Sequence, residues 1–234
     1  MNVDLHCHIL PGIDDGSESS EMSLEMLRRE RAQGVGRVVL TPHFYRHRED
    51  QRSFLKRRQA SYERLLRAME KDGGAFPELK LGAEVAMTTE LRFEDLSPLC
   101  IEGTNTLLLE LPFTKMGSWY GDVRAIIERN TYRVVLAHVE RFRDSLDKKS
   151  HEQIMELPCL KQINTSSIIE DGFFRRRQLL KWVADGDVHL LGTDAHNLDK
   201  RPVNIRKAIE ILSEKGHRAE AKEMIARGLK ISGG

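Results

Sequence analysis

The residues of this chain that could perform chemistry begin with His6 and His8, which follow a short apolar stretch at the start of the sequence. Side chains at positions i and i+2 of an extended strand point to the same face, so both imidazoles can reach one metal ion while Cys7 points away. A His-x-His pair is weak evidence by itself, because two histidines at a strand end can also be polar surface. A metal site therefore requires further ligand-type residues at the ends of other strands.

Such residues do recur after later apolar segments. Five of the nine histidines, and several carboxylates, stand where a predicted strand ends or just beyond it. The set comprises His6, His8, Asp14, Asp15, His43, Glu84, Glu110, His138, Asp194 and His196. Carboxylates that follow apolar strand residues are seldom buried unless they are paired or bind a metal. For any one residue a salt bridge is an equal alternative, but the whole set favours a metal centre.

The chemistry of this set indicates metal-assisted hydrolysis. Mixed nitrogen and oxygen ligands suit Mn, Fe or Zn better than Ca or Mg, and no thiolate is needed. Clustered divalent ions acidify water toward neutral pKa and can hold phosphoryl oxygens. These properties do not distinguish a phosphoester substrate from an amide.

Short apolar runs alternate with amphipathic stretches along the chain, which predicts alternating strands and helices. The predicted strands are 3–5, 37–40, 79–85, 106–111, 133–137, 160–164 and 188–192. The predicted helices are 20–33, 53–71, 90–96, 119–129, 150–157, 174–184, 203–215 and 218–228. Seven β-then-α units predict an α/β fold, a TIM-like distorted (β/α)7 barrel in a single domain over residues 1–234. A doubly wound open sheet is the alternative. In a barrel, the carboxyl ends of all strands gather on one face and would bring the ligand-type residues together.

The composition excludes several classes of protein. Charged residues make up 31% of the chain but balance to +1, which argues against a nucleic-acid partner. No apolar run approaches the roughly 20 residues that span a bilayer, and no signal peptide is recognised. The odd set of Cys7, Cys100 and Cys159 is interpreted as reduced thiols, which predicts a cytoplasmic protein without membrane insertion.

Several motifs together carry a family resemblance. They are His6-Cys7-His8, Asp14-Asp15-Gly16, Thr41-Pro42-His43, Glu84, Glu110, Ala137-His138-Val139-Glu140-Arg141 and Thr193-Asp194-Ala195-His196. With these motifs the chain resembles the PHP (polymerase and histidinol phosphatase) family. It is most similar to the bacterial manganese-dependent tyrosine phosphatases of capsule and exopolysaccharide synthesis. The opening through Gly16 and the closing segment through Arg201-Pro202 are specific to that branch.

The resemblance implies three Mn²⁺ ions, with Fe or Zn as alternatives, and a set of ligands for each. The first ion would be held by His6, His8, Glu84 and Asp194, the second by Glu84, Glu110 and His138, and the third by Asp15, His43 and His196. Asp14 would be a turn residue and not a ligand. Arg141 and Arg201 match the phosphate-binding arginines of the family, and a planar guanidinium suits bidentate phosphate binding. A metal-bridging hydroxide would attack phosphotyrosine in line, and the implied partner is the phosphorylated C-terminal tail of a bacterial tyrosine kinase.

Three other functions remain open. One is a PHP phosphoesterase acting on a small molecule such as histidinol phosphate. Another is an amidohydrolase, although such enzymes carry a bridging lysine where this chain has Glu84, Glu110 and His138. The third is an inactive binding module. Cysteine-based phosphatase chemistry is excluded, because the position six residues after each cysteine is Ile13, Thr106 or Thr165 and never arginine.

Two surface segments carry further expectations. The basic segment 44–58 suits an acidic phosphopeptide tail, with a solvated helix face as an equal alternative. The charged helix 21–31 is interpreted as a solvated surface, with self-assembly into a homo-oligomer as the alternative.

Overall fold

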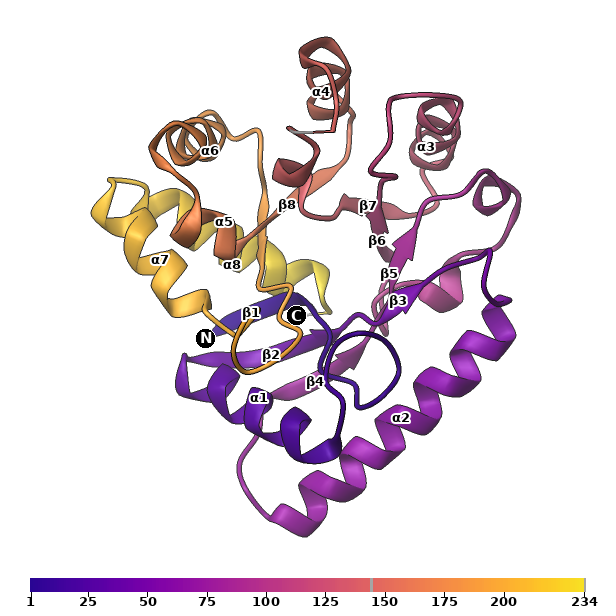
Figure 1. The fold of residues 1–234 in the computed structure, drawn as a ribbon, viewed down its shortest axis with the longest axis vertical. Helices are drawn as coiled ribbons and strands as arrows, with labels where there is room; N and C mark the ends of the chain where they lie inside the picture. Colours follow the sequence, from indigo (N-terminus) through magenta and orange to yellow (C-terminus); the bar gives the residue numbers. More distant parts are fainter. Residues whose placement is uncertain (144, 234) are drawn as a thin grey trace.

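In the computed structural model, which describes residues 1–143 and 145–233, the strands pair only in parallel and curl into a barrel (Figure 1). The strands are β1 (Asn2–Cys7), β2 (Val35–Leu40), β3 (His43–Phe44), β4 (Glu78–Leu81), β5 (Glu84–Ala86), β6 (Thr106–Glu110), β7 (Arg133–Leu136), β8 (Leu160–Asn164) and β9 (Leu190–Gly192). One sheet has the order β1-β2-β4 and the other β3-β5-β6-β7-β8-β9.

At two places the chain passes from one sheet to the other, once just beyond the predicted strand 37–40 and once within the predicted strand 79–85. β2 continues as β3 beyond Pro42, which has no N–H to donate, and the predicted strand 79–85 divides into β4 and β5 at Gly82. A Cβ at Gly82 would lie 3.1 Å from Val39 Cγ1, so only glycine fits comfortably there. When each interrupted pair is counted as one strand, the predicted seven-stranded order is confirmed.

The barrel closes between its first and last strands. Cys7 and Ala195 form an isolated parallel bridge, His8 N donates to Ala195 O at 2.8 Å, and Asp194 N donates to His6 O at 2.7 Å. The distorted (β/α)7 barrel predicted from the sequence is thus confirmed, and the doubly wound alternative is wrong.

Helices surround the strands as an outer layer (Figure 1). The α-helices are α1 (Ser20–Ala32), α2 (Gln51–Asp72), α3 (Trp119–Glu128), α4 (Lys148–Met155), α5 (Thr165–Glu170), α6 (Phe173–Asp185), α7 (Ile205–Glu214) and α8 (Arg218–Ile231). The 3-10 helices are η1 (Thr89–Phe93), η2 (Ser97–Leu99) and η3 (Val139–Arg143). The predicted short helix 90–96 is present as the 3-10 helix η1, which ends earlier than predicted, at Phe93. Its short length and the nearby Pro98 favour 3-10 turns here. The short helix α5 was not predicted.

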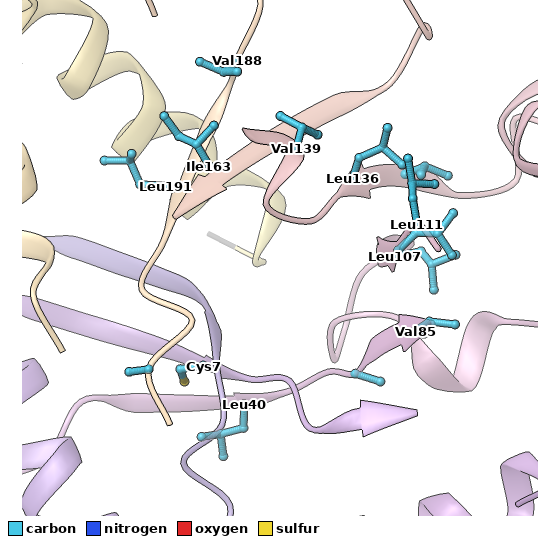
Figure 2. Packing of buried hydrophobic residues seen from close by; sticks show 14 of the residues in the cluster. Cys7, Leu40, Val85, Leu107, Leu111, Leu136, Val139, Ile163, Val188 and Leu191 are labelled. Atoms are coloured by element: carbon cyan, nitrogen blue, oxygen red, sulfur yellow. The ribbon is translucent and has the colours of Figure 1, made fainter. Parts of the chain in front are cut away.

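Alternating side chains of the strands build two apolar layers. Leu107 and Leu136 point outward to the helices (Figure 2), whereas Leu108 and Val135 belong to a second cluster inside the barrel. Ile231 at the end of α8 joins the inner cluster. Thr106 Oγ1 donates to Ile231 O at 2.9 Å, which ties α8 to the amino-terminal end of the barrel. The opposite end, where the strands terminate, is left for polar side chains. Among the described residues, no helix is both long and apolar enough to cross a bilayer.

Candidate metal centre

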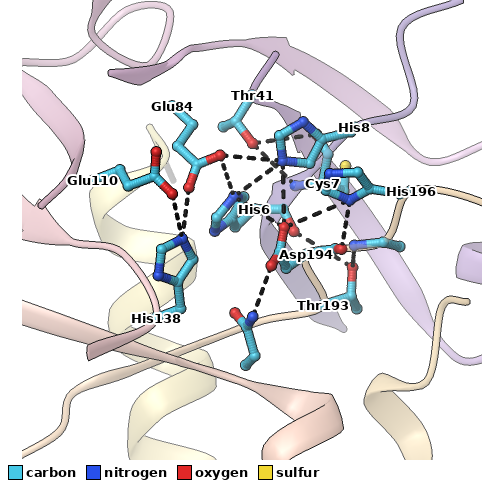
Figure 3. A network of polar contacts seen from close by, with 12 residues as sticks. His6, Cys7, His8, Thr41, Glu84, Glu110, His138, Thr193, Asp194 and His196 are labelled. Carbon is cyan, nitrogen blue, oxygen red and sulfur yellow. Dashed lines mark hydrogen bonds and ion pairs between the residues drawn. The ribbon is translucent and has the colours of Figure 1, made fainter. Parts of the chain in front are cut away.

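The nine predicted ligand residues converge at the carboxyl ends of the strands. They are brought there by β1 and the loop after it (His6, His8, Asp15), β3 (His43), β5 (Glu84), β6 (Glu110), the end of β7 (His138) and the segment after β9 (Asp194, His196). Figure 3 shows seven of them gathered in one network, with Cys7 beside it. All are buried except His43, which is partly exposed, and Asp15, whose side chain is 67% exposed. We call this group the candidate metal centre.

Four atoms at the middle of the centre surround a common point. His6 Nε2 lies 3.2 Å from His8 Nε2 and 3.2 Å from Glu84 Oε2, and His8 Nε2 lies 3.3 Å from the same carboxylate oxygen. Asp194 Oδ1 is 3.5 Å from His6 Nε2 and 3.4 Å from His8 Nε2. Ligands about 2.1 Å from a tetrahedral ion lie about 3.4 Å from one another, so this spacing matches a cation site.

Glu84 connects the middle of the centre to a second group. Its other oxygen, Oε1, lies 2.8 Å from His138 Nε2, which is 3.3 Å from Glu110 Oε1. His138 and Asp194 have positive φ angles of 32° and 53°, a backbone conformation that costs free energy in residues other than glycine. The fold holds both residues in this conformation where their side chains enter the centre.

A third group lies around His43. Asp15 Oδ1 is 3.3 Å from His43 Nε2 and 3.6 Å from His196 Nε2, and His8 approaches the same group. His43 Nδ1 is also 2.9 Å from Glu84 Oε2, and His43 can join Glu84 and Glu110 as a ligand set. His43 therefore lies within reach of both the second and the third ligand group, which the family resemblance treats as separate sets.

Histidines and carboxylates of the centre shift each other's pKa values, because a proton on a histidine is stabilised by the neighbouring carboxylates. Burial alone would lower the pKa of His8, but its hydrogen bonds to the carboxylates of Asp14, Asp194 and Glu84 raise that pKa well above its usual value. Burial also opposes protonation of His138, yet Glu110 and Glu84 raise its pKa to about 10. Despite burial, the nearby His6 lowers the pKa of Glu84 and of Asp194 well below the usual range.

The donor set fits a cation. Among the described residues, the buried atoms Glu84 Oε2 and His196 Nε2 make no hydrogen bond of normal geometry, although other ligand-type atoms lie close to both. Buried polar atoms in proteins are nearly always paired, and an ion that accepts electron pairs from both atom types would satisfy them. Neutral histidine and ionised carboxylate are the forms that bind metals, so a cation would replace the shared protons.

Two residues that support the centre, Gln162 and Asn164, were not identified from the sequence, and the contact of a third, Asp14, with His8 was not predicted. Gln162 Oε1 lies 3.1 Å from His6 Nδ1, and Asn164 Nδ2 donates to Asp194 Oδ2 at 2.8 Å. Asp14 was interpreted as a turn residue, and its Oδ1 does accept from Gly16 N at 3.0 Å. Its Oδ2 also accepts from His8 Nδ1 at 2.8 Å. The contacts of Gln162 and Asn164 join residues 156 and 30 positions apart in the sequence, which the barrel brings together, so no local pattern of residues predicts them.

Asp14 is expected to tune the centre through His8. In Asp14→Asn the turn can persist, but the carboxylate that orients His8 is lost, so we expect divalent-cation affinity to fall about 10- to 100-fold. Titration of the metal-free protein with Mn²⁺ would measure this change. Asp187→Asn, at an exposed site after α6, is the matched control. Equal affinity in the two variants would contradict a role for Asp14.

The two predicted arginines reach the centre at one carboxylate. Arg201 Nη2 lies 2.6 Å from Asp194 Oδ2, and Arg141 Nη1 lies 3.7 Å from the same oxygen. Both side chains are partly exposed, and they line a pocket of about 290 Å³ that also contains Lys200. Two guanidinium groups therefore stand at the solvent side of the centre, where an anion can reach them.

The basic segment 44–58 is part loop and part helix, in agreement with the predicted helix 53–71. Its second half is part of α2, because Asp50 accepts from Ser53 N and starts the helix there. Arg58 is buried and donates to Gly82 O at 2.7 Å. Arg46 pairs with Glu94, so its charge is not free for a ligand. Arg48, Arg52, Lys56 and Arg57 are exposed, as expected for a basic surface, whereas Arg46 is partly buried and Arg58 is buried. Contact of this segment with an acidic phosphopeptide stays a prediction.

Comparison with known proteins decides the family. Residues 2–229 match the family model described as "Capsular polysaccharide synthesis, CpsB/CapC". The chain belongs to the CpsB/CapC family. It is 27% identical over 236 residues to the tyrosine-protein phosphatase YwqE of Bacillus subtilis, covering 98% of this chain and 90% of YwqE. It is also 27% identical over 233 residues to the tyrosine-protein phosphatase CpsB of Streptococcus pneumoniae, covering 95% of this chain and 94% of CpsB.

The fold of this CpsB/CapC chain is also that of a solved relative. Crystal structures of YwqE and CpsB, described as unique metal-dependent tyrosine phosphatases, include a chain that superposes with a TM-score of 0.85 at 22% identity. The superposition covers 98% of this chain and 94% of the other. The resemblance to the capsule and exopolysaccharide branch that the motifs predicted is confirmed by these matches.

Proposed function

We propose that this CpsB/CapC protein is a metal-dependent protein-tyrosine phosphatase of the type that uses no catalytic cysteine. The observation that supports this most is the position of two guanidinium groups on Asp194, directly beside a buried cluster of histidines and carboxylates. Divalent cations and arginine side chains both bind the negatively charged oxygens of a phosphate group, so together they form a binding site for a phosphate dianion. The names of YwqE and CpsB support tyrosine phosphate as the substrate.

The proposed ligand sets follow the three groups of side chains. They are His6, His8, Glu84 and Asp194 for one ion; Glu84, Glu110 and His138 for the second; and Asp15, His43 and His196 for the third. The position of His43 near Glu84 also permits it to join the second set. Mn²⁺ is the proposed metal, because mixed imidazole and carboxylate ligands suit it, with Fe or Zn as alternatives.

Divalent cations bound here would act as Lewis acids toward water and the phosphoryl group. Arg141 and Arg201 bind the phosphate oxygens and orient phosphorus, exchanging their contact with Asp194 for the substrate. Their positive charge stabilises the charge that develops in the transition state. Glu84 holds the histidines of two groups in place through its two oxygens. Since phenolate is a fair leaving group, no strong protein acid is required.

The proposed physiological substrate is a phosphotyrosine in the C-terminal tail of a bacterial tyrosine kinase that controls capsule or exopolysaccharide synthesis. A protein substrate agrees with a centre that opens to solvent between Arg141 and Arg201. The three free cysteines support work in the reducing cytoplasm. We propose that residues 1–234 act as one phosphatase domain.

A direct substrate comparison tests this function. The Mn²⁺-loaded protein is expected to hydrolyse a phosphotyrosyl peptide with a kcat/KM at least about tenfold above that for histidinol phosphate, a difference of about 1.4 kcal/mol. Phosphate release measures both reactions. A preference for histidinol phosphate would replace the proposed substrate with a small molecule, and hydrolysis of neither would reject the proposal.

A further inference from the structure

Two histidines of the candidate metal centre, both in contact with Glu84, are each covered by an aromatic ring. Tyr45, directly after β3, stacks on His43 with 5.1 Å between ring centroids and 27° between the planes. Phe113, in the loop after β6, stacks on His138 at 5.7 Å and 22°. In Figure 3 His138 lies with Glu110 at one edge of the network, which places Phe113 at that edge.

Each of these two rings also carries an arginine. The guanidinium carbon of Arg48 lies 4.4 Å from the centroid of Tyr45, and that of Arg141 lies 4.8 Å from the centroid of Phe113. Arg141 is the residue that also approaches Asp194. Phe113 therefore contacts both a proposed metal ligand and a proposed phosphate-binding arginine.

Phe113 is a large apolar residue that remains well exposed although its ring packs against another aromatic ring. Its ring stacks on Phe142 at 4.9 Å, yet 44% of the residue remains exposed. Tyr45 is likewise only partly buried and lines a pocket of about 370 Å³ together with Asp15, His43 and Arg48. Apolar ring surface thus borders a centre that is otherwise built of charged and polar groups.

Resting on the phosphatase function proposed above, we propose that Phe113 and Tyr45 form the walls of a subsite for the aromatic ring of the leaving group. A single oxygen separates phosphorus from the first ring carbon of phosphotyrosine. With its phosphate on Arg141 and Arg201, the phenyl ring would lie beside Phe113, which contacts Arg141, while Tyr45 would approach it from the side of His43. Offset or edge-to-face contact between aromatic rings is favourable, and an alkyl phosphate has no ring with which to make it. The walls select aryl over alkyl phosphate esters.

The variant Phe113→Leu tests the subsite, because leucine keeps an apolar side chain but removes the ring. The measured quantity is the ratio of kcat/KM for a phosphotyrosyl peptide to that for the same peptide with phosphoserine, at saturating Mn²⁺. We expect this ratio to fall about three- to tenfold in Phe113→Leu and in Tyr45→Leu. Phe113→Tyr keeps the ring and is expected to retain the ratio.

Phe93→Leu is the matched control. Phe93 is 70% exposed and carries Arg92 at 4.4 Å from its centroid, but it lies on η1 and stacks on no histidine of the centre. An unchanged ratio in Phe113→Leu, or an equal loss with both peptides, would overturn the subsite even if the wild-type protein is an active phosphatase. Elemental analysis of each variant shows whether cation content has changed. If the wild-type protein hydrolyses neither peptide, the proposed function itself fails.

Discussion

Removal of divalent cations by a chelator is expected to abolish hydrolysis of a phosphotyrosyl peptide by this protein, and Mn²⁺ to restore it. The loss should reach at least about 10³-fold, because Lewis-acid stabilisation of a phosphoryl transition state amounts to several kcal/mol. The described residues of the centre offer no cysteine nucleophile, since Cys7 is buried and burial raises its pKa well above the usual value. Phosphate release, with elemental analysis before and after chelation, is the measurement. Full activity in protein shown to be free of metal would reject the mechanism.

The affinity of the metal-free protein for Mn²⁺ is expected to decrease as the pH decreases. Neighbouring carboxylates raise the pKa of His6, His8 and His138 above the ordinary value although burial opposes this. In the metal-free protein His138, whose pKa is raised to about 10, holds a proton at neutral pH, and a cation must displace this proton. The affinity for Mn²⁺ is therefore expected to fall as the pH is lowered from about 8 to about 6. Affinity that is constant over this range would show that these histidines do not bind the ion.

Glu84→Gln is expected to be the most damaging single substitution in the centre. The carboxylate lies within 3.3 Å of four histidine nitrogens, on His6, His8, His43 and His138. Glutamine has nearly the same shape, but it carries no negative charge and cannot bridge two cations. We expect a loss of phosphatase activity of at least about 10³-fold, together with weaker cation binding. Phosphate release and elemental analysis would measure the two effects.

Glu128→Gln provides the control for that experiment. Glu128 ends α3, is exposed, and pairs only with Arg124 one helical turn away among the contacts of the described chain. Such a surface change is expected to leave activity unchanged and to alter the free energy of unfolding by no more than about 0.5 kcal/mol. If Glu84→Gln were as active as Glu128→Gln, Glu84 would not bridge cations in this protein.

Much of the architecture was predictable because strands and helices follow from the spacing of apolar residues over short segments of the sequence. Apolar runs such as Leu107-Leu108-Leu109 predict strands buried on both faces, and their alternation with amphipathic segments predicts parallel strands and a barrel. The division of the strand at Gly82 was not predictable from local pattern, because the close approach of Gly82 to Val39, where a Cβ would lie 3.1 Å from Val39 Cγ1, depends on the neighbouring strand. The 3-10 geometry of the short helix η1 also escaped prediction, since its apolar spacing resembles that of an α-helix.

By itself, the sequence determined the types of the nine residues in the centre and their places at strand ends. The rule that parallel strands end on one face then sufficed to predict that they converge. Only the tertiary structure decided which atoms meet. It put His43 within reach of Glu84, turned Asp14 onto His8, and covered His138 with Phe113. These contacts join segments far apart in the chain or depend on side-chain direction, and no local pattern of residue types encodes either.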